Sequence, residues 1–204
     1  MTRRAMRLPL LAACLVMVAA CAGPRVRQGD AQDPRLLEQQ VGREQVLSAT
    51  AQWSLRGRLG VSDGRDGGSG TLEWRQRGDA FRFSVHAPVT GKTWTLSGTP
   101  SHAVLTGLRP QAVEGDDARA LLERELGWQV PVAGLVDWVR GMRAPGPAQI
   151  EFGPDGLPAV IVQDGWRIEF LDYDDSREPP LPRRLFASSG ERKVRLAIRE
   201  WAIE

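Results

Sequence analysis

The sequence is poor in the residues that build catalytic and metal centres. Its 204 residues include two cysteines, Cys14 and Cys21, and two histidines, His86 and His102. No cluster of His, Cys, Asp and Glu has metal-ligand spacing, and no Gly-x-Ser-x-Gly segment offers a hydrolase nucleophile. Because both cysteines lie within the first 21 positions, the rest of the chain can form no disulfide. These absences predict a protein that is not an enzyme and needs no metal or nucleotide.

The chain also has no apolar run long enough to span a bilayer. Leu8–Ala20 is apolar over 13 residues and follows the basic residues Arg3, Arg4 and Arg7. A basic start and a short apolar core are typical of a signal peptide. The run ends in Val18-Ala19-Ala20-Cys21, and small residues before a cysteine resemble the lipobox of bacterial lipoproteins.

The lipobox resemblance implies a lipid anchor at Cys21. Residues 1–20 would be removed, and Cys21 would carry a diacylglycerol group and an N-acyl chain. Ala22 follows the cysteine where an Asp would retain the protein at the inner membrane, so export to the outer membrane is expected. An ordinary secretory signal with an incidental cysteine is the alternative.

Removal of the signal peptide changes the charge balance. The whole chain has 27 Lys and Arg against 25 Asp and Glu, and residues 1–20 hold three Arg and no acid. The mature chain would therefore carry 24 basic and 25 acidic side chains. The excess of positive charge belongs to the signal peptide, so it gives no reason to expect nucleic-acid binding.

The mature chain divides into a tether and one folded domain. Residues 21–33 hold the lipidated cysteine and a polar stretch with almost nothing to bury. Asp33 and Pro34 then predict the start of a helix, and residues 34–204 form a single domain. From residue 51 the apolar side chains alternate with polar ones, as in strands with one buried face. Two short helices interrupt this pattern, one capped by Asp116 or Asp117 and one that begins after Pro131.

These segments predict a mainly β fold with helices. About ten or eleven antiparallel strands follow one another in hairpins, and such a sheet must twist and curl. Its concave face would carry Trp, Phe, Leu and Ile side chains. That face could enclose a hydrophobic cavity or a solid core, and the alternation of residues leaves both possibilities open.

One hairpin, residues 81–96, has an unusual connection. Its turn, Ala87–Lys92, contains Pro88 and Gly91, which favour a turn. Val89 is the sizeable apolar side chain of this turn, although turns normally face water. It could fold back onto a neighbour or project into an apolar environment.

Several motifs in order resemble the LolB family of bacterial outer-membrane lipoproteins. The resemblance covers about residues 34–204, and it depends on the order and spacing of the motifs together. The motifs are Trp53-Ser54-Leu55-Arg56-Gly57-Arg58, Leu72-Glu73-Trp74-Arg75-Gln76, Phe81–Gly91, Leu126–Val132 followed by Leu135, Trp138, Arg140 and Gly141, Gln163-Asp164-Gly165-Trp166, and a basic strand that ends in Trp201.

The resemblance implies an eleven-stranded half-barrel, covered by helices, with a hydrophobic cavity. Members accept the acyl chains of lipoproteins from the periplasmic carrier LolA and release them into the outer membrane without nucleotide. A protruding loop assists this insertion. Here the loop would contain Pro88, Val89 and Gly91, with Val89 at the tip where members commonly have Leu.

The apolar residues of the predicted strands and helices give a candidate set for the acyl-chain cavity. The set is Trp53, Leu55, Leu72, Trp74, Phe81, Phe83, Trp94, Trp138, Trp166 and Ile168. The expected partners are LolA, lipoprotein acyl chains and outer-membrane phospholipid, and the protein is expected to be a monomer that faces the periplasm. A lipoprotein that binds or senses a small lipophile is the alternative function. Arg56, Arg58 and the strand 192–199 could contact the carrier or simply face solvent.

Overall fold

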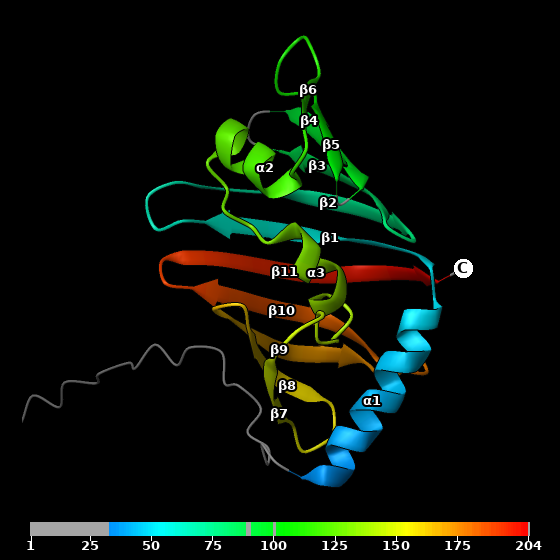
Figure 1. The fold of residues 1–204 in the computed structure, drawn as a ribbon. Helices are drawn as coiled ribbons and strands as arrows, with labels where there is room; N and C mark the ends of the chain where they lie inside the picture. Colours follow the sequence, from blue (N-terminus) through cyan, green and yellow to red (C-terminus); the bar gives the residue numbers. More distant parts are fainter. Residues whose placement is uncertain (1–32, 89–90, 100, 204) are drawn as a thin grey trace, which may run out of the picture.

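The computed structural model describes residues 33–88, 91–99 and 101–203. The predicted signal peptide, Cys21 and the tether up to residue 32 lie outside the described residues, as does Val89. The described chain forms one antiparallel sheet of 11 strands with helices on one of its faces (Figure 1). This arrangement confirms the predicted mainly β fold and its curled sheet of about eleven strands.

The elements follow one another in hairpins, with two helices inserted midway and one at the start. They are α1 (Pro34–Ala49), β1 (Gln52–Ser62), β2 (Gly67–Arg77), β3 (Ala80–Ala87), β4 (Lys92–Thr99), β5 (His102–Thr106), β6 (Val113–Gly115), α2 (Ala118–Leu126), α3 (Val132–Trp138), β7 (Ala148–Phe152), β8 (Pro158–Gln163), β9 (Trp166–Asp174), β10 (Leu181–Ser189) and β11 (Arg192–Ile203). The short strand β6 carries no alternating apolar pattern and was not expected from the sequence.

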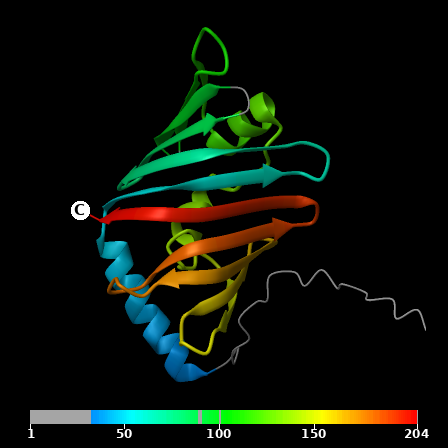
Figure 2. The same ribbon diagram turned by 180° about the vertical axis from the view of Figure 1, so that it is seen from behind.

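The strand order is β6-β5-β4-β3-β2-β1-β11-β10-β9-β8-β7. The first and last strands, β1 and β11, therefore pair at the centre of the sheet. In the described residues β6 and β7 form the two edges and are not paired with each other, so the sheet remains an open half-barrel. Helices α2 and α3 lie on its concave face, and Figure 2 shows the opposite face, with both helices behind the sheet.

Alternation along the strands separates a buried face from a solvent face. On β1, Trp53 and Leu55 are buried, whereas Arg56 and Arg58 are exposed. The buried side chains of neighbouring strands meet as a row of aromatic rings. The Trp74 ring centroid lies 5.0 Å from that of Trp53 and 4.4 Å from that of Phe83. Such aromatic contacts add to the hydrophobic stabilisation of the concave face.

The helix ends follow the sequence closely. Asp33 accepts a hydrogen bond from the backbone N–H of Arg35 at 2.9 Å, and Asp117 accepts one from Arg119 at 2.7 Å. These caps satisfy amides that have no partner within the helix. Helix α2 ends at Gly127, whose φ of 72° is the left-handed conformation that glycine adopts without strain.

Helix α1 buries polar as well as apolar side chains. Its apolar residues, Val41 among them, follow helical spacing, but Val41 is 43% exposed. The buried residues are Gln40, Arg43 and Leu47. The reason is that α1 packs partly on backbone carbonyl groups, which attract polar donors rather than an apolar stripe.

Candidate functional site

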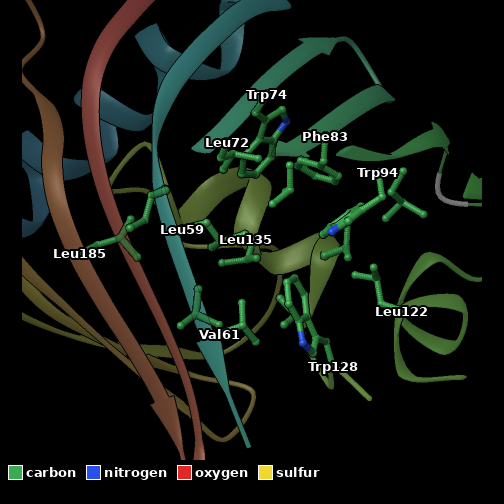
Figure 3. Close-up of a pocket in the computed structure, with 16 residues that line it drawn as sticks. Leu59, Val61, Leu72, Trp74, Phe83, Trp94, Leu122, Trp128, Leu135 and Leu185 are labelled. Atoms are coloured by element: carbon green, nitrogen blue, oxygen red, sulfur yellow. The ribbon is translucent and has the colours of Figure 1, made fainter. Parts of the chain in front are cut away.

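A cavity of about 60 Å³ lies between the concave face of the sheet and the inserted helices (Figure 3). Every side chain that lines it is apolar. The lining residues are Leu59, Val61, Leu72, Trp74, Phe83, Val85, Trp94, Leu96, Leu122, Trp128, Val130, Val132, Leu135, Leu185, Val194 and Leu196. This lining offers no carboxylate, imidazole, thiol or hydroxyl group, so it suits an apolar ligand rather than a metal ion.

The floor of the cavity comes from six adjacent strands. β4, β3, β2, β1 and β11 each contribute two inward-facing residues two positions apart, such as Leu72 and Trp74 on β2, and β10 contributes Leu185. A strand places alternate side chains on one face, which explains this spacing. The opposite wall is formed by α2, α3 and residues 127–131 between them, which we call the cover. Leu122 and Leu135 of the cover point toward the strands (Figure 3).

Trp128 is the largest side chain that the cover contributes to the cavity lining. The left-handed Gly127 ends α2, and the Trp128 amide donates back to the carbonyl of Leu122 at 3.3 Å. This turn directs the indole toward the sheet, where its ring lies 5.5 Å from that of Trp94 in an edge-on arrangement. Trp128 also lines a second hollow of about 10 Å³, so it separates two spaces.

The ten candidate cavity residues are all buried, but the structure divides them into two groups. Leu72, Trp74, Phe83 and Trp94 line the cavity. The others lie in the core beside it or on the wall of the second hollow. These are Trp53, Leu55, Phe81, Trp138, Trp166 and Ile168.

Two of the six show why burial alone does not mark a cavity. Trp53 is enclosed by the rings of Trp74 and Trp201, at 5.0 and 5.6 Å. Trp138 has no exposed surface, and its indole N–H donates to the Gln163 side chain at 3.0 Å. Rings that are surrounded by other side chains on all sides leave no space for a ligand.

Sequence reasoning missed most of the aliphatic lining. Leu59 and Val61 extend the alternation of β1, and Leu185, Val194 and Leu196 follow the same pattern on β10 and β11. The period-two pattern could have identified these residues as inward-facing. It could not identify them as cavity residues, because the gap depends on how closely the cover approaches the sheet.

A group of buried polar residues holds α3 and α1 together behind the cavity. Arg140, just after α3, donates to the carbonyl of Leu47 at 2.8 Å and to Asp137 at 3.1 Å. Arg43 of α1 donates to the carbonyl of Gly141 at 2.7 Å. Burial of these charges lowers the pKa of both arginines, and burial raises the pKa of Asp137.

A partly buried ion pair continues this polar group. Arg143 donates to Glu44 of α1 at 2.6 and 2.9 Å, and Gln40 donates to the same carboxylate at 2.9 Å. Burial alone would raise the pKa of Glu44, but these hydrogen bonds outweigh it and the pKa lies below its usual value. The same hydrogen bonds raise the pKa of Arg143. The polar group thus fixes one end of the cover relative to α1.

The predicted membrane-inserting loop is described only at its two sides. Pro88 and Gly91 are exposed, and the Gly91 amide donates to the carbonyl of Ala87 at 2.9 Å. Gly91 has a φ of 66°, which agrees with a turn at this position. Val89 lies outside the described residues.

No helix in the described ranges has both the length and the apolar character needed to cross a bilayer. Comparison with solved structures shows the fold. The crystal structure of a LolA superfamily protein from Nitrosomonas europaea resembles this one with a TM-score of 0.53, and the two sequences are 8% identical. The similarity covers 81% of this chain and 93% of that one.

Comparison with known sequences shows the family. A family model described as "Outer membrane lipoprotein LolB" matches residues 51–201. The outer-membrane lipoprotein LolB of Xanthomonas campestris pv. campestris (strain 8004) is 39% identical over 80% of this chain and 78% of its own length. That of Xanthomonas euvesicatoria pv. vesicatoria (strain 85-10) is 35% identical over 100% of this chain and 99% of its own length. The chain therefore belongs to the LolB family, as an outer-membrane lipoprotein of the system that localises lipoproteins.

Proposed function

We propose that this protein accepts lipoproteins from a LolA-like carrier by taking their acyl chains into the cavity under the cover, and then inserts them into the outer membrane. The observation that carries the proposal is the wholly apolar lining of the cavity. Acyl chains exposed to water cost about 25 cal/mol for each Å² of apolar surface. They must therefore pass from one apolar cavity to another during transfer.

The size of the cavity implies that the cover moves. Its volume of about 60 Å³ is well below the roughly 300–1,000 Å³ of typical small-ligand pockets. An acyl chain needs more room than this, so α2, α3 and residues 127–131 must move away from the strands when cargo enters. Trp128 and Leu135 would then contact the cargo instead of the floor.

Delivery is assigned to the loop between β3 and β4. In this proposal Pro88 and Gly91 shape the turn, and Val89 enters the boundary between headgroups and acyl chains. Transfer needs no nucleotide and no cofactor, because it runs from the carrier to this cavity and then to the bilayer in order of increasing affinity. The protein acts as a binding factor rather than an enzyme.

The proposal also includes a lipid anchor at the membrane. Diacylglycerol and an N-acyl chain on Cys21 hold the protein on the outer membrane, facing the periplasm, and residues 21–33 tether the domain. Anchoring raises the effective concentration of the receptor at its target membrane. The protein acts as a monomer and has no nucleic-acid partner.

A transfer assay tests this proposal. LolA loaded with a fluorescent lipoprotein is mixed with the chain from residue 21 onward carrying Cys21→Ala, and the holder of the label is identified by gel filtration. The label should move to this protein without nucleotide and then to added liposomes. If the carrier keeps its cargo while an apolar dye still enters the cavity, the protein is instead a lipoprotein that binds a small lipophile.

A further inference from the structure

The convex face of the sheet carries a concentration of positive charge opposite the cavity. The cations are exposed and lie on four adjacent strands, β3, β2, β1 and β11. They are Arg82 on β3, Arg75 and Arg77 on β2, Arg56 and Arg58 on β1, and Lys193, Arg195 and Arg199 on β11. We call these residues the cationic face. Figure 2 shows this side of the sheet without α2 or α3 over it.

Two of these arginines are direct cross-strand neighbours. Arg75 and Arg82 pair in the register of β2 and β3, and both are exposed. Like charges directly opposite each other in a sheet are destabilising. Such a pair indicates that this face serves an anionic partner rather than the stability of the isolated domain.

The carboxylates on these strands do not neutralise the face. Glu73 lies 3.1 Å from Arg56, and Glu200 lies 4.0 Å from the same guanidinium. The remaining cations have no carboxylate partner among the described residues, although Arg195 stacks over the ring of Phe186 at 5.3 Å. A mature chain that is close to neutral overall thus concentrates cations on one face.

A shallow hollow of about 180 Å³ lies within the cationic face. Its base is formed by Ser54 and Ala202, whose small side chains are paired across β1 and β11. Arg56 and Arg75 line it together with Glu73 and Glu200, whose carboxylates lie beside Arg56. Arg75 is the cation of the hollow that has no carboxylate partner among the described residues, so it is free to meet an anionic group.

We infer that the cationic face docks on anionic phospholipid headgroups of the membrane in which the protein is anchored. The reach of the tether supports this partner. About a dozen residues separate Cys21 from α1, and an extended chain of that length spans roughly 40 Å. The domain must therefore stay close to the membrane surface if the anchor at Cys21 in the proposed function is correct.

The position of the face favours a membrane over an acidic protein. The cavity and its cover lie on the opposite side of the sheet, so an acidic carrier bound here could not pass cargo directly into the cavity. A domain that lies on this face presents its cavity to the periplasm. Arg82 lies near the start of β3, and the β3–β4 connection follows the other end of the same strand.

Vesicle binding without cargo tests this inference separately from lipoprotein transfer. The chain from residue 21 onward with Cys21→Ala retains the core, which is built from residues between Leu47 and Trp201. Its binding is measured by flotation with vesicles of equal parts phosphatidylglycerol and phosphatidylcholine, and with vesicles of phosphatidylcholine alone. We expect binding to the anionic vesicles only, and weaker binding as salt is added.

The double variant Arg75→Gln with Arg82→Gln should weaken anionic-vesicle binding about 25-fold, at roughly fivefold for each cation near the surface. It should unfold no more easily than the parent, because the like-charge pair is removed.

The matched control is Arg35→Gln with Arg119→Gln. It removes the same charge from exposed positions on α1 and α2 and should bind as the parent does. Arg58→Gln alone should weaken binding to the anionic vesicles roughly fivefold, which tests the cationic face at a further position. The inference is overturned if the first pair has no effect, if the control pair loses as much, or if neutral vesicles bind equally well.

Discussion

The indole of Trp128 lies against Gly68, so that a methyl group at Gly68 would stand 2.8 Å from the ring carbon Cζ2. Gly68 is the second residue of β2, and Trp128 belongs to the cover. The Trp128 ring therefore packs directly on the backbone of β2, at a position where the strand has no side chain. This contact connects a single glycine to the position of the cover.

Gly68→Ala should displace the Trp128 ring from its contact with β2. Overpacking of this kind costs about 1–3 kcal/mol, so the free energy of unfolding in urea should fall by that amount. An apolar dye should enter the cavity faster, because the cover is held less closely. Stopped-flow fluorescence of the dye measures the second effect.

Gly60→Ala is the matched control for this substitution. Gly60 is on β1, and a methyl group there would meet only the Cβ of Arg195 at 3.9 Å, which is an ordinary contact. It should change the free energy of unfolding by less than about 1 kcal/mol and leave dye entry unchanged. Equal effects of the two variants would show that Trp128 does not depend on Gly68.

Arg43→Ala should be strongly destabilising. The Arg43 guanidinium donates to the carbonyls of Gly141, Arg140 and Pro180 at 2.7, 2.8 and 2.7 Å. Its loss removes the donor to the carbonyls of Arg140 and Pro180, at about 1–3 kcal/mol each, whereas the carbonyl of Gly141 keeps a hydrogen bond from Gln40 at 3.0 Å. We expect the free energy of unfolding to fall by about 3 kcal/mol or more in urea titrations.

Arg35→Ala provides the comparison on the same helix. Arg35 is exposed, and its removal should change stability by less than about 0.5 kcal/mol. If Arg43→Ala were equally mild, α1 would be held by its apolar contacts and not by the guanidinium.

Glu44→Gln should change how the free energy of unfolding depends on pH in the acid range. The pKa of Glu44 is lowered in the folded protein by the hydrogen bonds from Arg143 and Gln40, so its carboxylate stabilises the fold above the unfolded pKa of about 4.3. This contribution is lost as the pH falls through the lower, folded pKa. The variant should be about 1–2 kcal/mol less stable than the parent at pH 7, because charged hydrogen bonds are removed.

Urea titrations across this pH range provide the measurement. The difference between parent and variant should shrink as the pH falls below about 4, since the parent then loses the same carboxylate. A difference that stays constant down to the lowest pH would assign the loss to packing rather than to charge.

The fold was largely predictable because alternation is a local property of the chain. Trp53, Leu55, Leu72 and Trp74 read as one face of neighbouring strands, and the register of β1 and β2 places Leu55 opposite Trp74. The cap at Asp33 was predictable for the same reason, since it depends on a few adjacent residues. The sequence places the cap of α2 at Asp116 or Asp117, and the structure shows that Asp117 makes it.

The cavity was less predictable because its boundary is set by contacts between distant segments. Trp138 and Trp94 look alike in sequence as buried rings, but Trp138 is locked to Gln163 whereas Trp94 faces the space beside Trp128. The polar packing of α1 was equally hidden, because the carbonyls that bind Arg43 come from residues about 100 positions away. No local pattern carries that information.

Val89→Glu should separate the uptake of cargo from its delivery. The proposed function assigns Val89 to membrane insertion, and a carboxylate there must leave water to enter the bilayer. A penalty of only 1.4 kcal/mol corresponds to a factor of ten, so release of a labelled lipoprotein to liposomes should slow by about tenfold or more. Val89→Leu adds one CH₂, worth about 0.8 kcal/mol when buried, and should be neutral or faster.

Val46→Glu is the matched control for this prediction. Val46 is 56% exposed on α1, so the same substitution there adds the same charge away from the β3–β4 loop. Both Glu variants should take the label from LolA as the parent does and should unfold at the same urea concentration. Slower release by Val89→Glu alone would assign the loop to the membrane step. Equal slowing by both variants would assign the effect to repulsion between the added charge and anionic lipid, and would remove the loop from the mechanism.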